Sequence, residues 1–164
     1  MRTISIVVLA LAAAVVFGIA ARAAGTVPGS VEYQGNSVKF THVYLISSPD
    51  MFDPKATVRT LILTDADIGD KITACYSVFC ATGLVLNGMT VEFSHNPRLT
   101  YWVGVKNQLK QVTGSAIPVE VFKPKADTPD HLAGLLMIDD SGIKGPKGTA
   151  EFDVTLTKSF TSRN

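Results

Sequence analysis

Short segments with alternating apolar and polar positions recur along the chain and are separated by residues that favour turns. Such segments predict β-strands with one buried face. The expected strands cover residues 31–33, 38–46, 58–64, 84–86, 89–93, 99–105, 108–115, 132–138 and 152–156. A further segment, 117–122, would lie on a sheet edge because it contains Pro118. The pattern predicts an all-β fold, an immunoglobulin-like antiparallel β-sandwich of about eight or nine strands.

Three turns are expected from residues that readily take positive φ angles. Gly35-Asn36 suits a hairpin between the first two strands, and Lys106-Asn107 suits a turn before residue 108. Asn87-Gly88 lies between two apolar runs and is the strongest hairpin signal in the chain. Residues 58–64 are apolar on both faces near their end, which is typical of a central strand.

The period of the pattern changes after residue 64. An apolar stripe with helical spacing is formed by Ile68, Ile72, Cys75 and Phe79. It predicts one short helix over residues 66–76. Thr64 and Asp67 have the spacing of a capping box with Asp in place of the usual Glu, which favours a helix start at this point.

The first 23 residues have the pattern of a secretory signal peptide. Arg2 precedes a long uncharged apolar run, and Ala21-Arg22-Ala23 places small residues at the two positions that a signal peptidase reads. The alternative is an uncleaved membrane anchor, for which the run lies at the lower edge of spanning length. We expect cleavage before Ala24, a single domain over residues 24–164, no membrane span after cleavage, and a periplasmic or extracellular location.

Charge excludes one class of partner. Loss of the signal peptide removes Arg2 and Arg22, so the Lys plus Arg count falls from 15 to 13 against 14 Asp plus Glu. The remaining charges are interspersed and nearly balanced. A chain without a basic patch has no electrostatic attraction for nucleic acid, and none is expected as a partner.

The two cysteines carry the most specific chemistry. Cys75 and Cys80 are the only cysteines, and in an exported domain they predict one intramolecular disulfide. A redox pair would more often have two intervening residues, and zinc would need two further ligands nearby. Five residues of continuous helix rise about 7.5 Å, beyond disulfide reach. The helix must therefore end near Cys75 or Tyr76, and residues 76–79 are expected to form a loop.

Metal sites are the next alternatives. A copper site could use the following side chains in an oxidising compartment: His42, His95, His131, Met51, Met89 and Met137. No pair of them has ligand spacing. Asp65, Asp67 and Asp70 resemble the start of a calcium loop, but Gly69 is one place early and Tyr76 stands where a bidentate Glu is needed. We expect no metal and no other cofactor.

Two motifs remain for catalysis or ligand binding. Ser141 and Lys144 match a Ser-x-x-Lys nucleophile motif, but they lie in a Gly/Pro-rich loop and no Lys-Thr-Gly element accompanies them. Tyr101-Trp102 could offer an aromatic platform for a sugar, or Trp102 could pack under a loop beside Gly104. Tyr101 and Trp102 are the candidate ligand-binding residues.

Taken together, these features favour a non-enzymatic exported protein that acts through its surface as an adaptor or binding module. Its partner would be a protein or another component of the cell envelope. Two alternatives stay open: a small-ligand binder, with carbohydrate on Trp102 or copper on the His and Met side chains, and a hydrolase whose catalytic groups come together only in space.

Overall fold

The computed structural model describes residues 27–93, 99–116 and 118–163 of the 164-residue chain. The predicted signal peptide and His95 lie outside these residues. Within them the chain is mostly β. The strands are β1 Gly29–Tyr33, β2 Asn36–Lys39, β3 His42–Pro49, β4 Thr57–Thr64, β5 Gly88–Phe93, β6 Leu99–Val105, β7 Gln108–Ala116, β8 Phe122–Thr128, β9 His131–Asp139 and β10 Lys147–Ser159. The helices are α1 Gly69–Ala74, α2 Val78–Gly83, α3 Pro118–Val121 and the 3₁₀ turn η1 Ser141–Ile143.

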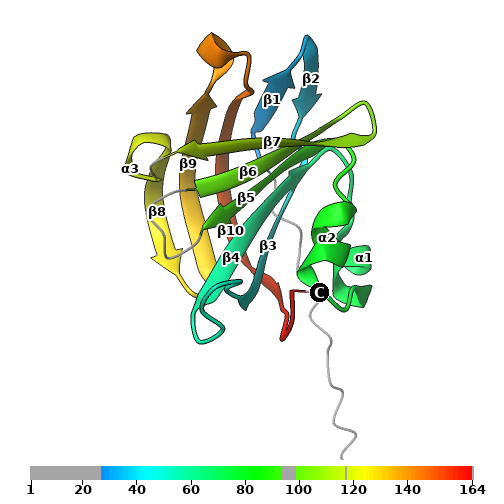
Figure 1. Cartoon of the computed structure of the whole chain (residues 1–164), viewed down its shortest axis with the longest axis vertical. Coiled ribbons are helices and arrows are strands. Elements are labelled where there is room, and N and C mark those ends of the chain that lie inside the picture. Colours follow the sequence, from blue (N-terminus) through cyan, green and yellow to red (C-terminus); the bar gives the residue numbers. More distant parts are fainter. Residues whose placement is uncertain (1–26, 94–98, 117, 164) are drawn as a thin grey trace, which may run out of the picture.

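The strands form one curled sheet in the order β2-β1-β10-β3-β4-β5-β6-β7, with β9 also paired to β10 and β8 paired to β9. Strand β10 belongs to two halves of this sheet. Its residues 147–155 pair antiparallel with β9, and Lys147–Ala150 pair with β1, whereas residues 156–159 pair parallel with β3. We call β3–β7 the front half, and β1, β2, β8, β9 and the start of β10 the back half (Figure 1). The predicted all-β class is confirmed, but the sheet is mixed because of the β10–β3 pair.

A central core fills the space between the two halves. The front half contributes Leu61, Leu63, Met89, Val91, Leu99, Tyr101 and Val103, and the back half contributes Val31, Leu132, Leu136, Ile138, Phe152 and Val154. Phe122 joins the halves, since its ring lies 5.2 Å from that of Phe93 and 5.9 Å from that of Phe152. Each such fully buried side chain stabilises the fold by about 1.5–3 kcal/mol.

A second cluster, here called the helix-side cluster, covers the outer face of β3 and β4. Tyr44, Ile46 and Ile62 lie on the sheet, and Ile68, Ile72, Cys75, Val78, Ala81, Val85 and Phe160 lie over them. Figure 1 shows α1 and α2 against this side of the sheet. Strand β4 is therefore buried on both faces, which confirms the prediction of a central strand at residues 58–64.

The helix predicted over residues 66–76 is present but shorter than predicted. Helix α1 spans only Gly69–Ala74, and a second helix, α2, starts at Val78. Thr64 does not cap α1; its hydroxyl accepts a bond from the amide of Ala66 and donates to the carbonyl of Asn87. One apolar stripe thus belongs to two helices, because the chain breaks at Cys75, whose backbone is extended.

Of the three predicted turns, the structure confirms one, places the second one residue earlier and contradicts the third. The Lys106-Asn107 turn is confirmed, with φ angles of 53° and 58°. The first hairpin forms, but its positive-φ residues are Gln34 and Gly35. Asn87-Gly88 is not a hairpin turn. Residues 84–86 form no strand, and Gly88 belongs to β5, where a Cβ would clash with the β4 backbone.

Two further strand predictions need correction. The segment expected at 38–46 is interrupted, because β2 ends at Lys39 and β3 begins at His42. Residues Pro118–Val121 form helix α3 rather than an edge strand, and pairing resumes only at Phe122. Among the described residues, no helix is long and apolar enough to cross a membrane.

Candidate functional site

The two predicted ligand-binding aromatics lie on opposite faces of β6. Tyr101 is fully buried in the central core, and its hydroxyl donates a hydrogen bond to Asp140. Trp102 lies on the outer face of the front half, opposite Thr90 of β5, and is half-buried. Next to it on this face, the carbonyl groups of Val85 and Leu86 approach Gly104 so closely that a Cβ would meet them at 2.7–2.9 Å. The pair does not form one exposed platform.

The histidine and methionine candidates are dispersed. His42 stacks on Tyr44 and its Nδ1 lies 2.8 Å from the hydroxyl of Thr41. His131 pairs with Asp153 of β10 at 2.7 Å. Met89 is in the central core, whereas Met51 and Met137 are exposed on different elements. No group of three His, Cys, Asp or Glu side chains in the described ranges could hold a metal ion.

The acidic segment at the start of α1 has a structural partner. The Tyr44 hydroxyl donates to Asp67 Oδ1 at 2.6 Å and accepts from the amide of Ile68 at 3.0 Å. Asp67 Oδ1 also accepts from the amide of Gly69. Burial, and then the bond to Asp67, raise the pKa of Tyr44 to about 12. The same bond lowers the pKa of Asp67. This carboxylate therefore fixes the entry to α1.

The Ser-x-x-Lys motif is part of an ion-paired turn. The Ser141 hydroxyl donates to Asp139 Oδ1 at 2.6 Å, and Lys144 takes a left-handed conformation. Bonds from Ser141, and then from Lys147, lower the pKa of Asp139 to about 2. The hydroxyl of Ser141 is thus directed to a carboxylate that stays ionised, rather than to the lysine of the motif.

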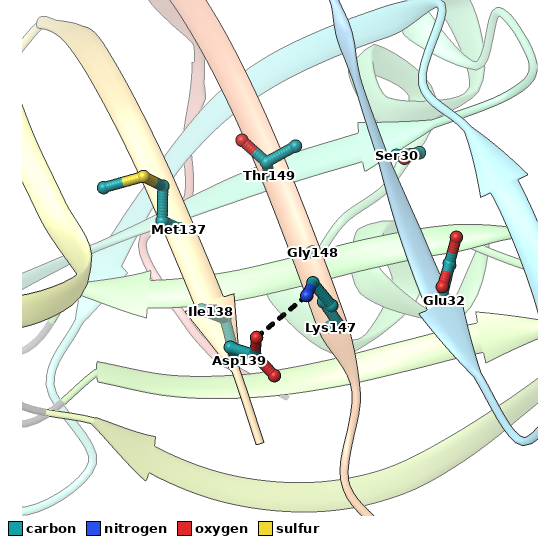
Figure 2. Close-up of a pocket in the computed structure, with 8 residues that line it drawn as sticks. All are labelled: Ser30, Glu32, Met137, Ile138, Asp139, Lys147, Gly148 and Thr149. Carbon is teal, nitrogen blue, oxygen red and sulfur yellow. Dashed lines mark ion pairs between the residues drawn. The ribbon is translucent and has the colours of Figure 1, made fainter. Parts of the chain in front are cut away.

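A shallow groove lies on the outer face of the back half. It has a volume of about 380 Å³ and runs over β1, β10 and β9 between Ser30, Glu32, Met137, Asp139, Lys147 and Thr149. Figure 2 shows the Lys147–Asp139 ion pair, 3.0 Å long, across one part of it. Two more cross-strand ion pairs, Lys125–Glu151 and His131–Asp153, lie on the same sheet. The charged side chains of these three pairs on this face are therefore paired with one another across the strands.

The loop between β3 and β4 exposes apolar side chains at the opposite end of the molecule from η1 (Figure 1). Phe52 is 92% exposed and Met51 is 60% exposed. The loop is nevertheless closely organised. Asp50 Oδ1 accepts from the amides of Phe52 and Asp53, and the amide of Asp50 donates to the carbonyl of Ala56. An ordered loop that holds two apolar side chains in solvent is typical of a contact surface.

A cleft of about 480 Å³ adjoins this loop, between β4 and the β8–β9 turn. Arg59 lies in it and pairs with Asp127 at 2.7 Å. Its guanidinium also donates to the carbonyl of Thr128 and lies 6.0 Å from the centre of the Phe93 ring. Lys55, from the loop itself, lines the same cleft.

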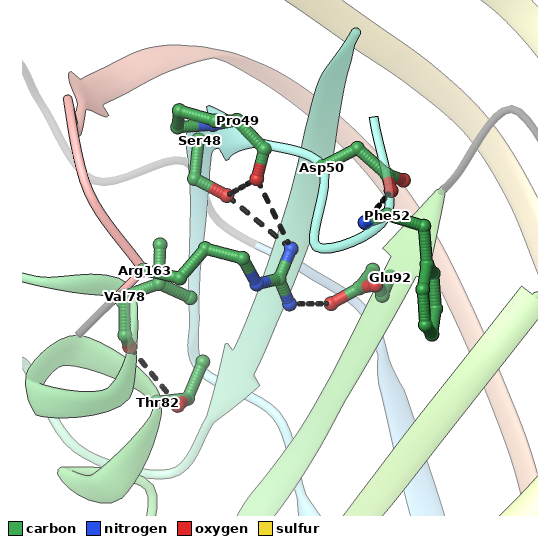
Figure 3. Close-up of polar contacts among 8 residues, drawn as sticks. All are labelled: Ser48, Pro49, Asp50, Phe52, Val78, Thr82, Glu92 and Arg163. Carbon is green, nitrogen blue, oxygen red and sulfur yellow. Dashed lines mark hydrogen bonds and ion pairs between the residues drawn. The ribbon is translucent and has the colours of Figure 1, made fainter. Parts of the chain in front are cut away.

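The C-terminal segment closes the other side of the loop. Arg163 donates to Glu92 Oε2 at 2.6 Å, and its second terminal nitrogen lies 3.5 Å from the Ser48 hydroxyl and from the Pro49 carbonyl. Figure 3 shows the guanidinium between β3 and β5, beside the turn that carries Asp50 and Phe52. The Phe79 amide of α2 donates to the Arg163 carbonyl. The loop, α2 and the C-terminus thus meet at one end.

The cysteine pair lies beside this region. The Cys75 and Cys80 sulfur atoms are 2.10 Å apart and their Cα atoms 5.6 Å apart, which confirms the predicted pairing and the end of α1 before Cys75. The expected loop over 76–79 is shorter than predicted, because α2 already begins at Val78. Tyr76 is 82% exposed and Phe79 is half in solvent. Lys158 of β10 donates to the carbonyls of Thr73 and Cys75 and ties α1 to the sheet.

The best candidate site is therefore the β3–β4 loop end, defined by Met51, Phe52, Tyr76, Phe79 and the Arg59 cleft. Reasoning from the sequence did not select the loop, although an apolar Met-Phe pair inside a turn marked by Asp50 and Asp53-Pro54 is an unusual signal. Comparisons of the chain with protein-family models, with curated proteins and with solved structures found no match.

Proposed function

We propose that this chain is a non-enzymatic, exported adaptor or binding module that contacts a protein or another envelope component through the β3–β4 loop end. The observation that carries the proposal is Phe52, a large apolar side chain 92% in solvent on a hydrogen-bonded loop. A pre-ordered apolar side chain loses little conformational entropy on binding, which is the usual property of an interface hot spot.

Other side chains at the same end support this role. Aromatic and arginine side chains are enriched at protein interfaces, and Tyr76, Phe79 and Arg59 supply them here. The outer face of the back half offers ion pairs instead, and charged residues are depleted at interface cores.

The export part of the proposal rests on residues 1–23 and on the cysteine pair. A disulfide persists in an oxidising compartment, which agrees with a periplasmic or extracellular location. We also infer an immunoglobulin-like use of the scaffold, in which a rigid two-layered β-domain presents loops at its ends. Mass spectrometry of the exported protein should find Ala24, or a close neighbour, at the N-terminus; an N-terminal Met1 would refute cleavage.

The binding proposal is tested by mild cross-linking in intact cells that express the tagged chain. Phe52→Ser should reduce the amount of the cross-linked partner on the order of ten-fold, as for loss of a hot-spot residue. Ile143→Ser is the matched control, since Ile143 is 82% exposed but lies in η1 at the opposite end. Equal cross-linking by wild type and both variants, or loss with Ile143→Ser alone, would overturn the assignment.

A further inference from the structure

The side chain of Arg163 crosses strand β4 from one neighbouring strand to the other. Ser48 of β3 is paired with Val58 of β4, and Thr60 of β4 is paired with Glu92 of β5. Because Arg163 reaches both Ser48 and Glu92, its guanidinium lies over the stretch of β4 between Val58 and Thr60. Both of these residues are at most 2% exposed. The result is a trough with Val58 and Thr60 as its floor and oxygen acceptors on both walls.

The acceptors are arranged for a guanidinium group. One terminal nitrogen donates to the Glu92 carboxylate and the other faces the Ser48 hydroxyl and the Pro49 carbonyl. The carboxylate is only 17% exposed and the arginine side chain 13%, so the charges are largely removed from water. A planar fork of donors can serve two walls at once, which a single ammonium group cannot.

The occupant fits the trough incompletely. The two contacts to β3 measure 3.5 Å, at the limit for a hydrogen bond. Arg163 Nε is buried and has no hydrogen-bond partner among the described residues. The segment is held more firmly at Phe160, which is buried in the helix-side cluster and donates from its amide to the Ser47 carbonyl. The side chain of Arg163 can therefore leave the trough while the bonds at Phe160 and from the Phe79 amide to the Arg163 carbonyl hold the backbone in place.

We propose that this trough, with Glu92 on one wall and the Ser48 hydroxyl and Pro49 carbonyl on the other, is a recognition site for an arginine side chain on an extended peptide segment, which the chain fills with its own Arg163 until a partner segment displaces it. Pro49, on one wall of the trough, leads directly into the loop that carries Phe52 (Figure 3), so an extended partner segment has both within reach. The proposal does not depend on the function proposed for Phe52, because the trough is defined by different side chains.

The test uses the full chain carrying Arg163→Ala and an acetylated tetrapeptide of threonine, serine, arginine and asparagine, the sequence of residues 161–164. Titration calorimetry should show saturable binding to this variant. Wild type should bind at least about ten-fold more weakly, because a tethered ligand competes at high effective concentration. The same peptide with lysine in place of arginine should also bind at least about ten-fold more weakly to the variant.

Adding Glu92→Gln to Arg163→Ala should abolish peptide binding. Circular dichroism first establishes that each variant is folded. If Arg163→Ala does not fold, Arg163→Lys is used instead of it, because the lysine keeps a cation beside Glu92. Absence of binding to the folded variant, equal binding of the arginine and lysine peptides, or binding that survives Glu92→Gln would each overturn the proposal. None of these results depends on Phe52, so the two proposals fail separately.

Discussion

Replacing Tyr44 with phenylalanine removes a single oxygen from the helix-side cluster, yet that oxygen holds the start of α1. The Tyr44 side chain is almost fully buried, and its hydroxyl contacts Asp67 and the amide of Ile68. The phenylalanine variant leaves that buried amide without its acceptor. An unsatisfied buried donor costs about 1–3 kcal/mol, which is the expected loss of unfolding free energy near pH 8.

The same hydroxyl makes stability depend on alkaline pH. The folded-state pKa of Tyr44 is about 12, against 10.0 for a free tyrosine, because ionisation would place a buried phenolate beside the Asp67 carboxylate. The raised pKa means that the stabilisation is complete below pH 10 and is lost as the pH rises toward 12. Two pKa units correspond to about 2.7 kcal/mol in total, of which about 1.4 kcal/mol is lost by pH 11.

Urea unfolding of wild type and Tyr44→Phe, measured at intervals from pH 8 to pH 11, isolates this effect, since the other titrating groups are common to both proteins. The stability difference should shrink by about 1.4 kcal/mol over that range. Tyr76→Phe is the control, because that ring is 82% exposed and its removal should change neither stability nor pH dependence. A wild type–Tyr44→Phe difference that stays constant up to pH 11 would refute the reasoning.

Other perturbations have equally defined outcomes. Gly104→Ala should lower the free energy of urea unfolding by about 1–3 kcal/mol, because the added Cβ would clash with the backbone that follows α2. Gly83→Ala is the control and should cause no loss, because a Cβ at that position meets nothing within 4 Å. Equal losses in the two variants would contradict the clash. Cys75→Ser with Cys80→Ser should cost about 2 kcal/mol and leave the β circular dichroism spectrum intact; a loss of the β signal would be the contrary result. The free energy of unfolding should fall less between pH 4 and pH 2 in Asp139→Asn than in wild type, because the lowered pKa of the Asp139 carboxyl stabilises the fold above that range. Urea unfolding at these pH values measures the difference. The same fall in both proteins would count against a lowered pKa of Asp139.

Local patterns predicted most strands because the two-residue period reflects burial of one face. They failed where a tertiary contact uses a residue for something else. The Asn87 side chain donates to the Asn107 side chain and accepts from the Asn107 backbone amide, and the residue forms no hairpin turn. Gly88 lies in β5 rather than in a turn, and there both its φ of 149° and the close approach of the β4 backbone favour glycine. Helix α2 was missed because the disulfide geometry predicts where the first helix ends, but not that a second helix begins at Val78.

The candidate site was less predictable for the same reason. The two-residue period of a strand places Tyr101 and Trp102 on opposite faces, but it does not say which face is the central core. Glu92 and Arg163 are 71 residues apart, and a non-local ion pair leaves no local pattern. Phe52 was visible as an apolar residue in a turn, but only the structure shows that its side chain is 92% exposed.

Strand β10 also sets the order in which the molecule can fold. Among the described strands it is the last, it pairs with the first, and it links the front half to the back half through β3. Strands β3–β7 pair with one another in chain order, whereas β1 and β9 are joined to each other and to β3 only through residues 147–159. Pairings this distant in sequence form slowly. The central core between the two halves is therefore completed only when β10 pairs with β3, β1 and β9.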